Sequence, residues 1–251
     1  MLDILKTRLT QGYQTKKYPK EAPVLPERFQ GLPEINNSNC GTCTICIDAC
    51  PANALKKENS KIVLDMNKCI FCGKCETLCP QKLISFTRDH SLAARAKQDL
   101  LLNEQNSFLK AKELEAERLG LFKKSFNLRQ VSAGGCGACE ADINVLTTLS
   151  FDLSRFGINL VASPRHADGM IVTGPVSKNM EYAVKNVYDA IADPKVVIAV
   201  GACAISGGLY ENSEETLNGV ADILPVDLFI PGCPPHPYTI LDGLLRLIGR
   251  I

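Results

Sequence analysis

The sequence predicts a small α+β module followed by a larger α/β domain with a doubly wound parallel sheet. Three observations support this division. A cysteine-rich unit occurs twice between residues 36 and 87. After residue 126, short β-branched apolar runs that end in glycine or proline alternate with amphipathic helical stretches. The intervening stretch differs from both in composition.

Residues 1–35 are expected to form an N-terminal arm, because a proline-rich, irregular segment follows a short amphipathic stretch. The apolar residues of that stretch are Leu2, Ile4, Leu5 and Leu9. It predicts a possible surface helix that lies on a membrane with Lys6 and Arg8 among the head groups. A short buried helix, or an arm packed on a partner, is the alternative.

The repeat in residues 36–87 has the spacing Cys-x-x-Cys-x-x-Cys-x-x-x-Cys-Pro in both copies. This run is typical of bacterial two-cluster ferredoxins, in which three thiolates hold one cubane and the fourth, displaced cysteine binds the other. We therefore predict a ferredoxin-like 2×[4Fe-4S] module with crossed ligand sets. The first cluster takes Cys40, Cys43, Cys46 and Cys79, and the second takes Cys69, Cys72, Cys75 and Cys50.

A pair of structural zinc sites is the alternative, but zinc has no use for a third cysteine at the same position of both copies. Lys68 and Lys74, beside the second copy, are expected to be solvated. Residues 88–125 are expected to be a helical linker, because from about Ser91 to Lys124 the sequence is rich in Ala, Leu, Lys, Glu and Gln and lacks proline.

Residues 126–251 are predicted to form the doubly wound domain, of the flavodoxin-like type. The segments SFNLRQVSAGG, GMIVTGPV, KVVIAVGA and VDLFIPG are expected to be buried parallel strands. The segments KNMEYAVKNVYDAIAD and PYTILDGLLRLIGRI carry apolar residues at helical spacing.

The remaining cysteines all follow carboxyl ends of predicted strands, where cofactors bind in open α/β sheets. Cys136 and Cys139 follow the first strand, Cys203 follows KVVIAVGA and Cys233 follows VDLFIPG. Four thiols suit a third [4Fe-4S] cluster, so all twelve cysteines become iron ligands. Alternatively, Cys203 and Cys233 are small buried apolar residues. Neither G-x-G-x-x-G nor a Walker motif is present, so nucleotide binding is unsupported.

Composition excludes several classes of protein. The 28 basic and 27 acidic residues leave a net charge of +1, so no basic field attracts nucleic acid. No apolar run approaches the roughly 20 residues that cross a bilayer. Because the first residues include Asp3 and Lys6, no export signal is expected, and clustered thiols in a reducing cytoplasm are expected to bind metal.

The second domain resembles the small subunit of nickel–iron hydrogenases and the related B-type subunit of respiratory complex I. The resemblance rests on GGCGACEADINVLTTLS, FGINLVASPRHADGMIVTGPV, VIAVGACAISGG and PVDLFIPGCPPHP, in that order. The first module, with the lead-in KKYPKEAPVLPERFQGLP, resembles the two-cluster I-type subunit of complex I. Glu140 matches a family glutamate near the large subunit, which implies a proton relay or a residue that supports the cluster ligands. The alternative is an acid that stabilises a helix N-terminus.

One departure separates the two relatives. The complex I subunit has adjacent cysteines at the first cluster-binding position, whereas Gly137 and Ala138 separate Cys136 from Cys139 here. The Cys-x-x-Cys form resembles group 4, membrane-associated hydrogenases and formate hydrogenlyase, although fusion to a ferredoxin module is unusual for that family.

The resemblance implies an electron-transfer small subunit of an oxidoreductase complex, with no complete catalytic site of its own. Three [4Fe-4S] clusters would relay electrons between a redox donor protein and the nickel–iron site of a [NiFe] hydrogenase large subunit. Complex I-like membrane subunits would hold the chain on the cytoplasmic, inner face of the cell membrane. The alternatives are a subunit of a nickel-free, complex I-like quinone or ion-pumping complex, and a stand-alone ferredoxin-type carrier.

Overall fold

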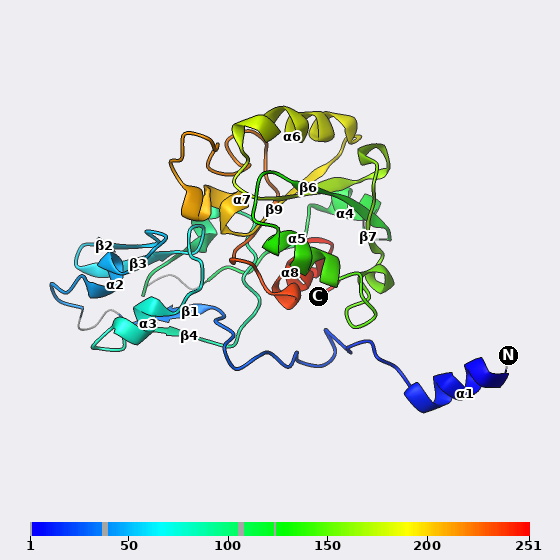
Figure 1. Ribbon diagram of the computed structural model, residues 1–251, viewed down its shortest axis with the longest axis horizontal. Coiled ribbons are helices and arrows are strands. Elements are labelled where there is room, and N and C mark those ends of the chain that lie inside the picture. Colours follow the sequence, from blue (N-terminus) through cyan, green and yellow to red (C-terminus); the bar gives the residue numbers. More distant parts are fainter. Residues whose placement is uncertain (1, 37–39, 105–107, 123) are drawn as a thin grey trace.

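The computed structural model describes residues 2–36, 40–104, 108–122 and 124–251. In this part of the chain an N-terminal arm leads into a small α+β region, which packs beside a larger α/β domain (Figure 1). Predictions that fall on residues 37–39, 105–107 and 123, at the start of the first module and within the linker, lie outside the described residues.

The α/β domain is built on a five-stranded, fully parallel sheet with the order β10-β9-β8-β6-β7. Numbered within the domain, this order is 2-1-3-4-5 read from β7, so the predicted flavodoxin-like doubly wound fold is confirmed. The strands are β6 (Phe126–Ser132), β7 (Ile158–Leu160), β8 (Gly169–Thr173), β9 (Val196–Val200) and β10 (Leu228–Ile230). Only β7 was not predicted; it has three residues and an asparagine at its centre.

Helices cover both faces of this sheet, which explains why β8 and β9 are apolar and buried along their whole length. Helix α6 lies on one face, and α5 and α8 lie on the other (Figure 1). Two of these helices are the predicted ones. The helices of the domain are α5 (Ala138–Val145), α6 (Lys178–Ala190), α7 (Ala202–Ser206) and α8 (Pro237–Leu247), with 3₁₀ turns η2 (Leu153–Phe156), η3 (Pro164–His166) and η4 (Gly208–Tyr210).

The described residues of the small region form two antiparallel sheets and two short helices, as expected for an α+β ferredoxin-like module. Its elements are β1 (Pro33–Ile35), α2 (Ile45–Asp48), β2 (Leu55–Glu58), β3 (Lys61–Asp65), α3 (Lys74–Leu78) and β4 (Ile84–Phe86). Asn59 and Ser60 join β2 to β3 with φ of 49° and 64°, as a tight hairpin requires. Because β1 pairs with β4, the last residues of the expected arm belong to this region.

The prediction that residues 88–125 form a helical linker is wrong. Among the described residues of 88–125, α4 (Ala116–Phe122) is α-helical, whereas η1 (Lys97–Leu100) is a 3₁₀ turn and β5 (Leu101–Leu102) a strand. Residues 101–102 pair with β3, and Ala94 exchanges two backbone hydrogen bonds with Phe229 of β10, of 3.0 and 2.9 Å. Apolar residues that would line a solvated helix are instead buried between the two modules, as Leu92 and Leu100 are.

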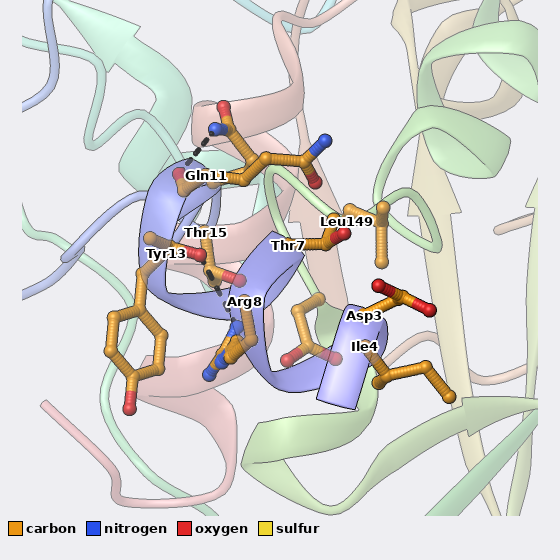
Figure 2. A pocket seen from close by; sticks show the side chains of 11 residues that line it. Asp3, Ile4, Thr7, Arg8, Gln11, Tyr13, Thr15 and Leu149 are labelled. Atoms are coloured by element: carbon orange, nitrogen blue, oxygen red, sulfur yellow. Dashed lines mark hydrogen bonds between the residues drawn. The ribbon is translucent and has the colours of Figure 1, made fainter. Parts of the chain in front are cut away.

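The N-terminal arm begins with α1 (Leu2–Gln11), the predicted surface helix, none of whose residues is buried. Leu2, Leu5 and Leu9 are exposed, and Figure 2 shows Thr7 on the same side of α1 as Leu149 of the α/β domain. The described residues contain no helix that is both long and apolar enough to cross a bilayer.

Tyr18 anchors the arm to the α/β domain. Its hydroxyl donates a 2.8 Å hydrogen bond to Oδ1 of Asp242 in α8, which is 1% exposed and is paired with Arg246. Burial, and then the charge of Asp242, raises the pKa of Tyr18, so the phenol stays a proton donor. His90 packs edge-on against Tyr18, with Nε2 3.1 Å from its hydroxyl.

Tyr18→Phe is expected to destabilise the full chain by about 1–3 kcal/mol, because a buried carboxylate loses a hydrogen bond. Thermal unfolding of the cluster-loaded protein measures this as a lower midpoint. Tyr182→Phe is the control, since Tyr182 is 77% exposed and should leave the midpoint unchanged. Equal midpoints for both variants would contradict the anchoring role.

Candidate iron–sulfur sites

The first predicted thiol set lies at the α2–α3 end of the small region. Cys46 is a buried residue of α2, Cys40 and Cys43 precede it in the same loop, and Cys79 caps the end of α3. The pKa of the Cys46 thiol is raised first by burial and then by the negative charges of Cys79, Cys40 and Cys43. The four thiols therefore interact, although Cys79 belongs to the other repeat.

The second predicted set has the same crossed arrangement. Burial raises the pKa of Cys69 to about 12; a backbone hydrogen bond opposes this rise, and the charges of Cys75, Cys50 and Cys72 add to it. Burial likewise raises the pKa of Cys75 to about 11, and the charges of Cys50, Cys72 and Cys46 contribute. Since Cys46 belongs to the first set, the two sets are close neighbours.

Backbone amides point at the sulfurs of this region. The N–H groups of Ala54, Phe71 and Leu83 donate to the Sγ atoms of Cys50, Cys69 and Cys79, at 3.3, 3.3 and 3.4 Å. Such bonds orient a thiolate ligand and stabilise its charge. Sequence reasoning missed the neighbouring Lys57, whose Nζ donates to the carbonyl oxygens of Gly41 and Cys43 at 2.7 and 3.0 Å.

The third predicted set lies at the carboxyl edge of the parallel sheet. Cys136 and Cys139 sit at the start of α5, Cys203 is in α7, and Cys233 follows β10. Burial raises the pKa of Cys139 to about 12, and the charges of Cys203, Glu140, Cys233 and Cys136 add to the effect. Three loops far apart in sequence thus bring their thiols to one place, as expected from the ends of parallel strands.

Two glycines leave space beside these sulfurs. At Gly201, with φ of 90°, an added Cβ would lie 2.6 Å from Sγ of Cys139. At Gly208, with φ of 54°, it would lie 3.0 Å from Sγ of Cys203. Both positions need a left-handed backbone and the absence of a side chain. The donor set and this space fit a bulky iron–sulfur cluster, for which the chain supplies the thiolates.

Glu140 lies at the switch point of the sheet, between the ends of β6 and β8. Its Oε1 accepts hydrogen bonds from Ser132 Oγ at 2.6 Å and from Thr173 Oγ1 at 2.7 Å. Burial alone would raise the pKa of Glu140, but the two hydroxyls and its own backbone N–H lower it below its usual value. The carboxylate is therefore anionic near neutral pH. Ser132 and Thr173 are the last residues of β6 and β8, which were predicted as strands. Their position at the carboxyl ends of predicted strands could have indicated them from the sequence.

The described side chains do not form a compact mononuclear metal site. Within residues 2–36, 40–104, 108–122 and 124–251, no three His, Cys, Asp or Glu side chains converge on a position for one ion.

Paired cysteine runs on a ferredoxin-like region, beside a parallel sheet with thiols at its carboxyl edge, define an iron–sulfur electron-transfer protein. The family model described as "4Fe-4S dicluster domain" matches residues 39–84, and that described as "NADH ubiquinone oxidoreductase, 20 Kd subunit" matches residues 136–247.

Curated relatives match about half of the chain. A probable membrane-bound hydrogenase subunit, mbhJ, of Pyrococcus furiosus is 44% identical over 121 residues, 48% of this chain and 72% of the relative. Formate hydrogenlyase subunit 7 of Escherichia coli is 39% identical over 55% of this chain and 54% of its own length. The B-type NADH-quinone oxidoreductase subunit of Phocaeicola vulgatus is 47% identical over 45% of this chain and 58% of its own.

The chain belongs to the family of the complex I 20 kDa subunit, which includes membrane-bound hydrogenase and formate hydrogenlyase subunits, and it carries an N-terminal 4Fe-4S dicluster domain. It is an electron-transfer, iron–sulfur subunit of the oxidoreductase complexes of that family.

The crossed ligand sets predict which single-cysteine variants resemble each other. Cys79→Ser should alter the same electron paramagnetic resonance (EPR) signal as Cys40→Ser, and Cys50→Ser the same signal as Cys69→Ser, because each pair would share one cluster. Reductive titration of the four variants followed by EPR measures this. If Cys79→Ser instead matches Cys69→Ser, each repeat holds its own cluster and the crossed assignment is wrong.

Proposed function

We propose that this chain is the electron-transfer small subunit of a membrane-associated, multisubunit [NiFe] hydrogenase. It would connect a redox donor protein to the nickel–iron site of a partner large subunit, in the direction of proton reduction or of hydrogen oxidation. The observation that carries the proposal is the Cys136-x-x-Cys139 pair, which meets Cys203 and Cys233 at the edge of the sheet. The similarity to the hydrogenase and formate hydrogenlyase relatives supports it.

Twelve cysteines would hold three [4Fe-4S] clusters, which supply one-electron chemistry when bound. The protein would fix the sulfurs through backbone amides and exclude water by burying Cys46 and Cys69. In the third set, Cys136 and Cys233 are the exposed members. The large subunit would cover this edge, together with the exposed apolar side chains of Val145 and Leu149.

Glu140 suits a proton relay on this edge. Its carboxylate is half-buried and anionic, and two hydroxyl groups hold it in one orientation. Because its pKa is lowered, the carboxylate is a weak base, so it would hold a proton from a donor in the large subunit only transiently before passing it on. The chain itself carries no complete catalytic site in this proposal.

The two thiol sets of the small region would form the entry for electrons from the donor protein. Complex I-like membrane subunits would hold the assembly on the inner, cytoplasmic face of the membrane, in line with the membrane-bound hydrogenase relative. The exposed α1 could contribute to that contact.

A nickel-free, complex I-like quinone or ion-pumping complex is the second candidate. The 47% identity to the NADH-quinone oxidoreductase relative favours it as strongly as the 44% identity to the hydrogenase relative favours nickel. The Cys-x-x-Cys spacing of Cys136 and Cys139 favours the hydrogenase candidate.

Nickel per iron in the native complex tests the proposal. The complex is isolated through a tag on this chain after mild solubilisation, and about one nickel per chain is expected. Three clusters without nickel would favour the complex I-like candidate. A chain that purifies alone with all its clusters would instead indicate a stand-alone ferredoxin-type carrier.

Cys139→Ser is expected to abolish hydrogen turnover and to spare the EPR signals of the paired clusters, because Cys139 belongs to the third set alone. Hydrogen evolution with a reduced artificial donor measures the first effect, and EPR the second. Retained turnover would rule out a role for this thiol beside the catalytic subunit.

A further inference from the structure

Two side-chain contacts join the segments that carry the second and third thiol sets. Lys68, directly before Cys69, forms an ion pair with Glu211, which directly follows η4. The side chains are 28% and 23% exposed, so the pair is partly shielded from water. Lys68 was expected to be solvated, and this expectation is wrong because its partner lies 143 residues away.

A hydrogen bond runs parallel to this ion pair. Oγ of Ser206, the last residue of α7, donates to the backbone carbonyl oxygen of Asn67 at 2.8 Å. Asn67 is itself fixed, since its side chain donates to Asp65 Oδ1 at 2.7 Å and to the carbonyl of Lys97 at 3.0 Å. The carbonyl that Ser206 binds lies two residues before Cys69, and Ser206 lies three residues after Cys203.

We propose that the Lys68–Glu211 ion pair and the Ser206–Asn67 hydrogen bond form a latch that fixes the Cys69 site against the Cys203 site and keeps the joint between them electrically neutral. Lys68, Glu211 and Ser206 are positioning residues, because they act through the segments that carry the thiols. The latch rests on the proposed three-cluster relay, and it assigns the spacing between the second and third clusters to named side chains.

Because the joint is neutral, removal of one of its charges should shift the midpoint potential of the Cys69 cluster in a predictable direction. A cation beside a cluster stabilises the reduced, more negative state and raises its midpoint potential, whereas an anion lowers it. Glu211 offsets the charge of Lys68 next to Cys69. Removal of either charge alone should shift the potential of the Cys69 cluster, and the two shifts should have opposite directions.

The test compares Glu211→Gln, Lys68→Met and the double variant in the full, cluster-loaded chain. Redox titration followed by EPR should show a positive shift for Glu211→Gln and a negative shift for Lys68→Met. The double variant should return towards the unmodified value, since the joint is again neutral. Glu181→Gln is the matched control, because it breaks the exposed Lys185–Glu181 pair of α6 and should shift nothing.

Ser206→Ala tests the spacing separately from the charge. It should weaken the magnetic interaction between the second and third clusters, seen as narrower EPR lines of the doubly reduced protein, and leave both midpoint potentials unchanged. If a variant only misfolded, it would lose both clusters. If misfolding caused the shifts of the single-charge variants, the Lys68→Met/Glu211→Gln double variant would not restore the midpoint potential of the Cys69 cluster. Shifts of the same sign for Lys68→Met and Glu211→Gln, or unchanged line widths in Ser206→Ala, would overturn the latch.

These measurements need neither nickel nor a donor protein, so their outcome is separate from that of the hydrogenase test. Opposite potential shifts in a nickel-free complex would support the latch and remove the hydrogenase proposal. Unmodified protein that lacks the second or third cluster would overturn the three-cluster relay and the latch together. Unchanged potentials in a chain with all three clusters would overturn the latch alone.

Discussion

The architecture depends on the segment that joins the two modules, because it supplies backbone hydrogen bonds to both. Ala94 adds to the edge of the parallel sheet beside Phe229, and a few residues later Leu101 and Leu102 add to the sheet of the small region. A region of about fifty residues buries too little apolar surface to be firmly stable by itself. This one is completed by the connecting segment, and its apolar core is continuous with the face of the large sheet beneath α6.

Burial of the thiols disfavours their charged form, and hydrogen bonds from nearby backbone amides oppose this effect. Burial protects the sulfurs but raises the pKa of thiols such as Cys69 and Cys139, so the charged form is disfavoured in the protein alone. Amide donors and glycines at the sulfurs oppose that cost where iron binds. Folding and cluster binding are therefore linked, since iron supplies the positive charge that the buried thiolates lack.

The sheet geometry extends this logic to the carboxyl edge of the parallel sheet. The switch point between β6 and β8 opens a crevice at the carboxyl ends, where Glu140 is held by Ser132 and Thr173 beside the third thiol set. Near Cys203 of the same set, Ser206 and Glu211 contact the small region through Asn67 and Lys68. In our proposals, the third set thus connects an edge that binds the large subunit with a joint that fixes the second set.

The sequence by itself determined the fold class, because strand-ending glycines and the repeated short cysteine spacings are local signals. The grouping of the cysteines into three ligand sets is a prediction from the same spacings. The sequence could not determine the linker: an alanine- and leucine-rich run reads as a helix, but burial between two surfaces overrides that propensity. Nor could it pair Lys68 with Glu211 or Glu140 with Thr173, since such contacts join residues far apart in sequence. Only the packing of the modules and the order of the parallel strands decided them.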